Sequence, residues 1–511
     1  MKPLARNVIL VVFDSLRKDC IGAYGPAPWG PVHTPHFDAL ARESLMMTRM
    51  YPESLPTLPT RRALYTGRRV YPFHNADFHL KGDFVGAPGW GPIPEEQPTL
   101  AELLSEAGYR TALVSDVYHM FKPSKNYWRG FDQWTFLRGQ EKDPYRSGPR
   151  LTQEQLDYWL PRQLQNENTV SFIQQCIMNI HDRTREEDYF APRVLKAAAE
   201  WLEQNQDADR FFLTVESFDP HEPWLVPQHY RRMYLRDDGP EQVKSGYEDT
   251  LQLDEVLLQR TRANYYGNVS LCDRWFGHFM ESLRVLGLLD DTLVVFTSDH
   301  GDYLGAHGLF LKGVAPFEEV YRVPLVLRGP GIEPGTVVDE PVSLVDLGRT
   351  LTSLLLGAEH GDAFGGHGRD LSGLLQAAPR DDTGAHRSGT GDAESVGAFA
   401  EFHGQRLAYT QRIVWRGRYK YVFNGFDRDE LYDLETDPHE LTNLAALPEH
   451  AGLAREMAAA MWREVRRTGD ATLGDAQYGM FRFAPVGPEA EPKRERAPEP
   501  EPELTLGSDE H

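Results

Sequence analysis

The chain has 511 residues, of which 41% are hydrophobic and 11% aromatic, so it can bury at least one large core. This composition excludes an intrinsically disordered chain and a small disulfide-stabilised protein. The formal net charge of −22 argues against non-specific binding to nucleic acid, whereas a local group of cations can still accept an anionic substrate.

Cysteine usage and the N-terminal residues bear on the cellular compartment. The three cysteines, Cys20, Cys176 and Cys272, are far apart and odd in number, which excludes a disulfide framework and a paired-cysteine metal site. The apolar run at residues 7–13 ends at Asp14 and is too short for a secretory signal. No later stretch reaches the roughly 20 apolar residues of a membrane span. We therefore expect a cytoplasmic protein without a membrane span.

Four short apolar runs are typical of strands that are buried on both faces of a parallel sheet. The runs occupy residues 8–13, 110–114, 211–215 and 293–296. Each run leads into a polar cluster that contains Asp, His or Ser, and helical patterns such as 100–108 and 194–202 lie between the runs. This alternation predicts an α/β fold with a large, mostly parallel sheet sandwiched by helices. Because ligands bind such sheets at the carboxyl ends of the strands, we expect the polar clusters to share one crevice.

The chain is predicted to form a large first domain and a smaller second one. We assign residues 1–375 to the α/β domain and interpret residues 130–190 as an insertion that shapes the substrate entrance. The Gly-, Ser- and Asp-rich stretch 376–396 is typical of an exposed linker. Residues 397–484 are predicted to form a small α+β subdomain, and the Pro- and Glu-rich residues 485–511 to be disordered. The strand and helix patterns of the subdomain lie at 397–402, 412–415, 419–423 and 453–465.

Ligand-type side chains follow two of the predicted strands. Asp14 comes directly after the first strand, and Asp299 and His300 follow the strand at 293–296. Carboxylate oxygens with one imidazole suit Ca²⁺, Mn²⁺, Mg²⁺ or Zn²⁺ rather than copper or an iron–sulfur cluster. The alternative for Asp14 alone is the N-cap of the following helix.

A second group of residues combines a hydroxyl, a proline and an arginine. Thr57 precedes Pro59, Thr60 and Arg61, and a helical apolar pattern follows. This layout places a nucleophilic hydroxyl at a helix N-terminus, where the helix dipole and free amides favour an anion. Arg61 supplies a planar cation that matches phosphate or sulfate oxygens. The alternative is an ordinary capped helix with solvated arginines.

A third group comprises Asp219, His221, His119 and Lys312. These side chains would form a positive rim that neutralises developing charge and protonates the leaving oxygen. The alternative for a histidine after Asp-Pro is a surface or packed residue.

The motifs and their order resemble the sulfatase family of the alkaline phosphatase superfamily. The resemblance rests on Asp14-Ser-Leu-Arg-Lys-Asp19, Thr57-x-Pro-Thr-Arg61, Ser298-Asp-His-Gly301, Gly305-x-His-Gly308 with Lys312, and Glu430-Leu-Tyr-Asp-Leu-Glu-Thr-Asp-Pro-His-Glu-Leu-Thr-Asn443. It covers roughly residues 5–465. It implies the alkaline phosphatase-like fold, an ester hydrolase activity and one role for each matching residue. The implied metal ligands are Asp14, Thr57, Asp299 and His300, and the implied catalytic residues are Thr57, Arg61, His119, His221 and Lys312.

Two departures from the family pattern bear on the chemistry. Many sulfatases carry two adjacent carboxylates where this chain has Asp14-Ser15. Family sulfatases also carry a cysteine or serine at the Thr57 position, which is oxidised to formylglycine, and threonine cannot become an aldehyde. We therefore expect no formylglycine, and a covalent Thr57 ester would have to be broken by water. This requirement favours phosphoryl over sulfuryl chemistry.

The leading hypothesis is a metal-dependent hydrolase that cleaves a phosphodiester, phosphonate monoester or sulfate ester by in-line attack of Thr57. Ca²⁺ or Mn²⁺ is the first candidate metal and Zn²⁺ a further one. A second metal held by Asp219, His221 and either His367 or His403 is an alternative, and no residue is assigned to an organic cofactor. Transfer to an alcohol and non-catalytic binding are the alternative functions. The expected substrate is an anionic ester of a small molecule, glycan or lipid head group, and the oligomeric state stays open, a homo-oligomer included.

Overall fold

The computed structural model describes residues 4–70, 89–123, 125–243, 253–313, 315–376, 396–403, 410–425, 427–470 and 473. Within these residues, nine strands form one large sheet in the order β4-β3-β5-β1-β6-β7-β2-β8, with β9 paired to β2. Its strands are β1 (Asn7–Phe13), β2 (Leu45–Tyr51), β3 (Arg110–Ser115), β4 (Gln133–Phe136), β5 (Phe211–Ser217), β6 (Thr292–Ser298), β7 (Val323–Arg328), β8 (Thr336–Val338) and β9 (Val342–Ser343).

The four strands expected from the apolar runs are neighbours in this sheet. β3, β5, β1 and β6 lie side by side and run parallel, and Val11 of β1 stands opposite Val215 of β5 and Phe296 of β6. β7 is antiparallel to both of its neighbours, so the sheet is mostly parallel. The predicted α/β fold is confirmed, and the carboxyl ends of β3, β5, β1 and β6 lie along one edge of the sheet.

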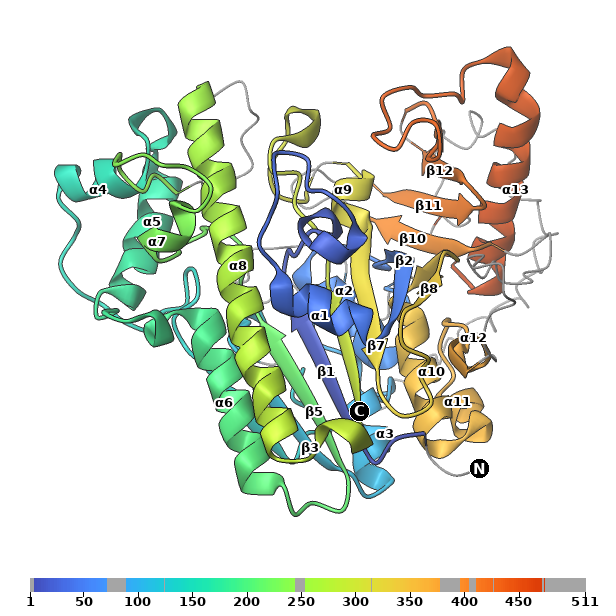
Figure 1. The fold of residues 1–511 in the computed structure, drawn as a ribbon. Helices are drawn as coiled ribbons and strands as arrows, with labels where there is room; N and C mark the ends of the chain where they lie inside the picture. Colours follow the sequence, from blue (N-terminus) through green and yellow to red (C-terminus); the bar gives the residue numbers. More distant parts are fainter. Residues whose placement is uncertain are drawn as a thin grey trace, which may run out of the picture.

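Helices cover both faces of the large sheet (Figure 1). Alternate residues of β1 point to opposite faces, so Val8 and Leu10 join one hydrophobic cluster and Ile9 and Val11 join the other. The first cluster includes side chains from α2 (Thr57–Thr66), α3 (Leu100–Glu106) and α10 (Val345–Leu356). The second includes side chains from α1 (Pro35–Arg42), α6 (Phe190–Asn205) and α8 (Glu255–Val285).

Four antiparallel strands and a helix form the smaller C-terminal part, at the upper right of Figure 1. These elements are β10 (Ala398–Phe402), β11 (Gln411–Arg416), β12 (Tyr419–Asn424), β13 (Glu430–Asp433) and α13 (Ala451–Arg467). One face of the small sheet packs on α13, with Phe423 against Trp462, and the other packs on the large domain, where Trp415 stacks on Tyr51 at 4.0 Å. The predicted linker, apart from Gln376 and Val396, and the predicted tail lie outside the described residues.

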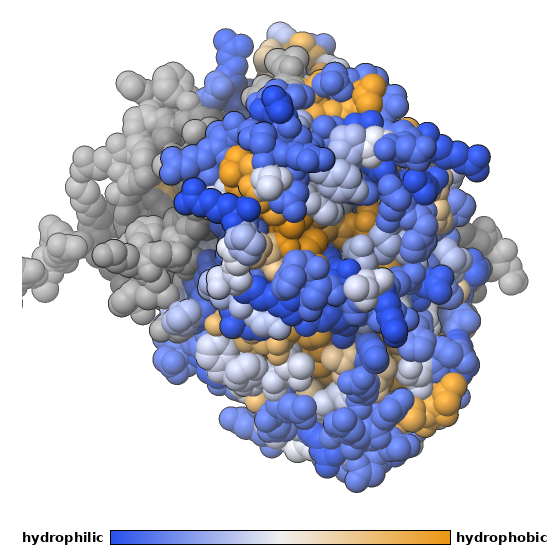
Figure 2. Space-filling view, turned by 90° about the vertical axis from the view of Figure 1, so that its left-hand side faces the viewer, coloured by the Kyte–Doolittle hydropathy of each residue, from blue (hydrophilic) through white to orange (hydrophobic). Residues whose placement is uncertain are grey.

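The segment 130–190 adds the edge strand β4 and two helices to the large domain. Helices α4 (Gln153–Trp159) and α5 (Glu167–Ile180) share a small hydrophobic cluster that includes Leu160 and Ile173. Figure 2 shows the side of the molecule on which these helices lie; hydrophilic residues cover most of it, and hydrophobic residues gather in separate patches. The remaining described helices are α7 (Gln228–Arg231), α9 (Glu318–Tyr321), α11 (Ala358–Phe364) and α12 (Ser372–Gln376). Among the described helices, none is both long enough and apolar enough to cross a membrane.

Candidate active site

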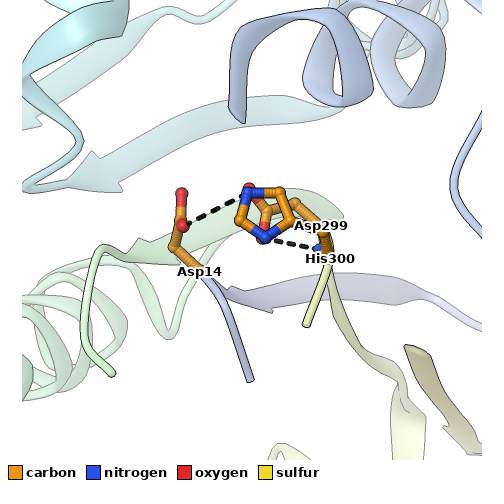
Figure 3. A group of neighbouring side chains, drawn as sticks. All are labelled: Asp14, Asp299 and His300. Atoms are coloured by element: carbon orange, nitrogen blue, oxygen red, sulfur yellow. Dashed lines mark hydrogen bonds and ion pairs between the residues drawn. The ribbon is translucent and has the colours of Figure 1, made fainter. Parts of the chain in front are cut away.

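The ends of two neighbouring strands bring three ligand-type side chains into one cluster. Asp14 follows β1, Asp299 and His300 follow β6, and all three side chains are fully buried. His300 Nε2 lies 3.8 Å from Asp14 Oδ1 and 3.4 Å from Asp299 Oδ2 (Figure 3). Because β1 and β6 are parallel with Phe13 opposite Ser298, the residues that follow them meet.

The geometry of His300 leaves one ring nitrogen facing the carboxylates. Its Nδ1 lies 2.9 Å from the carbonyl oxygen of Gly301, which can only accept, so Nδ1 carries the proton and Nε2 keeps a lone pair. Burial lowers the pKa of His300 to about 4, which keeps the ring neutral at pH 7. Nε2 has no hydrogen-bond partner among the described residues. A neutral ring nitrogen beside two carboxylates is a donor set that suits a divalent cation.

A third carboxylate and an arginine extend this buried cluster. Arg61 Nη1 donates to Asp14 Oδ2 (2.9 Å) and Asp299 Oδ2 (2.6 Å), while Arg61 Nε donates to Glu216 Oε2 (2.9 Å). The Tyr65 hydroxyl also donates to Glu216 (2.7 Å). Burial raises the pKa of Asp14 and of Glu216, because it removes their charge from water. Three carboxylates against one guanidinium leave negative charge for a cation to balance, so the residues present fit a divalent metal.

Thr57 begins helix α2, and Arg61 lies one turn later on the same helix. Arg61 Nη1 donates to Thr57 O (3.1 Å) and to the two aspartates, which places the threonine backbone beside the candidate metal ligands Asp14 and Asp299. The sequence interpretation directed Arg61 at the oxygens of a bound anion. In the structure the Arg61 side chain is fully buried, and its Nε and Nη1 donors are directed at carboxylates and at Thr57 O. Arg61 therefore links the backbone of Thr57 to the candidate metal ligands.

Lys312 and His221 meet on another side of the site. Lys312 Nζ contacts His221 Nε2 and lies 3.3 Å from Glu222 Oε2, and these side chains are buried. The His221 ring stacks on Phe218 with the ring centres 4.1 Å apart. Burial, and then the Lys312 charge, hold the pKa of His221 well below its ordinary value. The structure thus brings Lys312 and His221 together, as the sequence interpretation placed them.

Glu141 joins His221 to His119. Its Oε1 lies 3.4 Å from His221 Nδ1, its Oε2 lies 3.6 Å from His119 Nε2, and the Tyr118 hydroxyl donates to Oε2 (3.0 Å). The sequence reasoning missed Glu141, because it follows a short edge strand in a segment without a clear pattern. Glu216 was also missed, although it stands in the polar cluster at the end of β5. An acidic residue at the end of a strand indicates a candidate site, but the sequence does not identify the positively charged side chain that it contacts.

The residues of the alternative two-metal site do not come together. Asp219 accepts hydrogen bonds from Ala191 N (3.0 Å) and Asn268 Nδ2 (3.3 Å). His367 Nδ1 accepts from Arg69 N (2.9 Å), and His403 lies beside Glu401. Among the described residues, the clusters able to hold a metal are Asp14 with Asp299 and His300, and Glu141 with His221 and Glu222.

Ser15 stands where many sulfatases, by resemblance, carry a second carboxylate. Its hydroxyl donates to Asp14 Oδ1 (3.1 Å) and its backbone N–H donates to Asp299 Oδ1 (3.0 Å). Ser15 therefore orients both candidate ligands without adding a charge.

Comparison with known proteins identifies the family. The profile of the family described as Sulfatase matches residues 6–358, which is more than half of the chain, and the profile described as N-sulphoglucosamine sulphohydrolase, C-terminal, matches residues 305–467. The chain is 27% identical over 489 residues to a choline-sulfatase of Rhizobium meliloti (strain 1021), and the match covers 89% of this chain and 86% of that protein.

Two further similarities cover almost the whole chain. It is 26% identical to the multifunctional alkaline phosphatase superfamily protein PehA of Trinickia caryophylli, over 90% of this chain and 95% of the relative. The crystal structure of the phosphonate monoester hydrolase of Agrobacterium radiobacter superposes with a TM-score of 0.66 at 24% identity, covering 93% of this chain and 97% of that one. The chain thus belongs to the sulfatase family of the alkaline phosphatase superfamily and is an ester hydrolase.

Proposed function

We propose that this protein hydrolyses a phosphodiester, phosphonate monoester or sulfate ester by in-line attack of the Thr57 hydroxyl. The observation that carries the proposal is the set of contacts of Arg61 Nη1, which reaches Thr57 O, Asp14 and Asp299 at once. A nucleophile at the start of a helix and a cation site beside it are the two parts that metal-assisted in-line cleavage of an ester would use.

A divalent cation would be held by Asp14, Asp299 and His300, with the Thr57 hydroxyl directed at it. Such an ion would polarise the ester and lower the pKa of the attacking hydroxyl. Lys312, which contacts His221 and Glu222, would stabilise the negative charge that develops on the departing oxygen. Arg61 would hold the two aspartates and the first turn of α2 in fixed positions relative to one another.

Among the three ester classes we favour phosphoryl transfer, because of the threonine at position 57. The Thr57 oxygen forms a bond to phosphorus as the bond to the alcohol oxygen breaks, and the alcohol leaves with the hydroxyl proton. Water then attacks phosphorus, the bond to the Thr57 oxygen breaks, and the hydroxyl is restored. The similar proteins include a choline-sulfatase and a phosphonate monoester hydrolase, so resemblance alone does not choose between the classes.

The test compares wild type with Thr57→Ala on p-nitrophenyl sulfate, phosphate monoester, phosphodiester and phosphonate monoester substrates, each with Mn²⁺, Ca²⁺ or Zn²⁺. Thr66→Ala is the matched control, because its hydroxyl bonds to Arg62 O (2.7 Å) within the same helix. We expect phosphodiester or phosphonate turnover that disappears in Thr57→Ala and persists in Thr66→Ala.

Product analysis with added glycerol separates hydrolysis from transfer to an alcohol. Free acid as the main product supports hydrolysis, whereas a glycerol ester as the main product assigns the protein to the transferases. Dominant sulfate turnover would overturn the preference for phosphorus. Activity that survives in Thr57→Ala would overturn the role of Thr57, and metal binding without turnover of any ester would identify a non-catalytic binder.

A further inference from the structure

Glu141 reaches the site from the loop after the edge strand β4, and its backbone is held in an uncommon conformation. Its φ is +44°, in the left-handed region that non-glycine residues seldom adopt and that occurs preferentially at functional sites. Asn179 of α5 donates to Glu141 O (3.2 Å), and the adjacent Gln140 side chain donates to Asp116 Oδ2 (2.7 Å). The α4–α5 segment and the end of β3 therefore hold this loop in place.

The two ring nitrogens of His221 have different hydrogen-bond roles, and the protonated one faces Glu141. The ammonium of Lys312 can only donate, so His221 Nε2 accepts from it and Nδ1 carries the ring proton. Nδ1 faces three oxygens: Glu222 O at 2.9 Å, Glu222 Oε2 at 3.1 Å and Glu141 Oε1 at 3.4 Å. A protonated nitrogen cannot bind a metal ion, so the cluster of Glu141, His221 and Glu222 is a hydrogen-bonded unit rather than a second metal site.

Lys312 interacts with this unit and with the candidate metal ligands. Burial raises the pKa of Asp14 and of Glu141, and the Lys312 charge opposes part of that rise at both carboxyl groups. Glu222 balances the Lys312 charge directly at 3.3 Å, and Glu141 lies on the far side of the His221 ring, beside its Nδ1. Glu141 also lies 3.6 Å from His119 Nε2, so one carboxylate contacts both His221 and His119.

We propose that Glu141 is a positioning residue for the leaving-group side of the site: it orients His221, and through it Lys312, together with His119. This inference rests on the proposed function. The loop from the 130–190 segment thereby completes a site whose other parts come from the large sheet and from α2. Glu141 acts through these side chains and does not touch the substrate.

This role predicts a dependence on the leaving group. An aliphatic alcohol leaves with more negative charge on its oxygen than p-nitrophenol does, so its departure depends more on a correctly placed Lys312. Glu141→Gln keeps the size of the side chain and removes its charge. We expect kcat/KM to fall about 10- to 100-fold for an aliphatic ester, the range typical of lost supporting contacts, and several-fold less for the p-nitrophenyl ester. The fall is expected in kcat rather than KM.

The experiment measures wild type, Glu141→Gln, Glu141→Asp and Asp273→Asn on matched p-nitrophenyl, phenyl and aliphatic esters of the class that wild type cleaves. Asp273→Asn is the matched control, because Asp273 is a buried acid that accepts from His36 N (3.0 Å) and Phe37 N (2.7 Å) and is not part of the Glu141 loop. We expect Asp273→Asn to keep the wild-type ratio between the esters and Glu141→Asp to restore part of it. Tyr118→Phe removes the 3.0 Å hydrogen bond to Glu141 and is expected to change the ratio of kcat/KM between the esters in the same direction as Glu141→Gln. This variant tests the proposal if Glu141→Gln does not fold.

Each outcome decides between stated readings. Glu141→Gln with an unchanged ratio, or with an equal loss on every ester and a lower melting temperature, overturns the positioning role. Titration with Mn²⁺ is expected to show one site in wild type and in Glu141→Gln; two sites in wild type, one of them lost in Glu141→Gln, would overturn the hydrogen-bonded unit in favour of a second metal. A wild type without turnover on any ester refutes the proposed function itself, which is distinct from a failure of this inference.

Discussion

Arg61→Ala removes the guanidinium that lies among Asp14, Asp299 and Glu216. All four side chains are fully buried, and removing one partner of a buried ion pair costs about 3–5 kcal/mol of unfolding free energy. An unfolding entropy of about 2.1 cal/mol/K per residue gives roughly 0.75 kcal/mol/K for a domain of about 350 residues. The melting temperature of the large domain is therefore expected to fall by about 4–7 °C.

Calorimetry of the metal-free protein measures this fall, with Arg62→Ala as the matched control. Arg62 is the next residue on α2, is also buried, and donates to Gln97 Oε1 at 3.4 Å, but in the described part of the chain it has no ion pair. Its replacement is expected to cost less than half as much. Added Mn²⁺ should recover part of the loss in Arg61→Ala, because a divalent cation balances the same carboxylates. If Arg61→Ala melts within about 1 °C of wild type, or loses no more than Arg62→Ala does, the charge argument fails.

Two further predictions concern metal binding and pH. His300→Ala should weaken Mn²⁺ binding at least about tenfold by calorimetric titration, whereas His229→Ala, at an exposed histidine, should leave the affinity unchanged; equal affinities would remove His300 from the ligand set. Burial raises the pKa of Asp116 to about 7 from an ordinary 3.8, so the folded state binds the proton more tightly and wild-type stability should fall as the pH rises from about 4 to about 7. Asp116→Asn should make that slope less steep in thermal melts recorded across this range, and an unchanged slope would contradict the assignment.

The group formed by Asp14, Asp299 and His300 could be predicted from the sequence because these residues follow parallel strands. Asp14 comes directly after one buried strand and Asp299 directly after another, and parallel neighbours bring their carboxyl ends to the same edge. Thr57 and Arg61 are one helical turn apart, so their proximity also follows from local spacing. These positions depend only on strand register and helix periodicity, both of which a sequence pattern carries.

The partners of these residues could not be predicted in the same way. Glu141 lies in a loop whose path depends on contacts with Asn179 and Asp116, which are distant in sequence. The direction of the Arg61 side chain depends on Glu216 from a strand far along the chain. Such pairings are set by tertiary packing. Residue type and spacing therefore predict that a charged group is present, but they do not identify its partner of opposite charge.

Helix α2 shows how burial decides between two interpretations that the sequence left open. The sequence permitted a capped helix with solvated arginines, but Arg61 and Arg62 are both buried, and Arg61 has no exposed surface. A fully buried guanidinium requires anionic partners, and the strand-end carboxylates require a cation, so each group explains the presence of the other. Because the three carboxylates outnumber the arginine, the ion-pair cluster keeps negative charge that a further cation can balance. That imbalance, more than any single motif, supports the proposal of a metal site beside the helix that begins at Thr57.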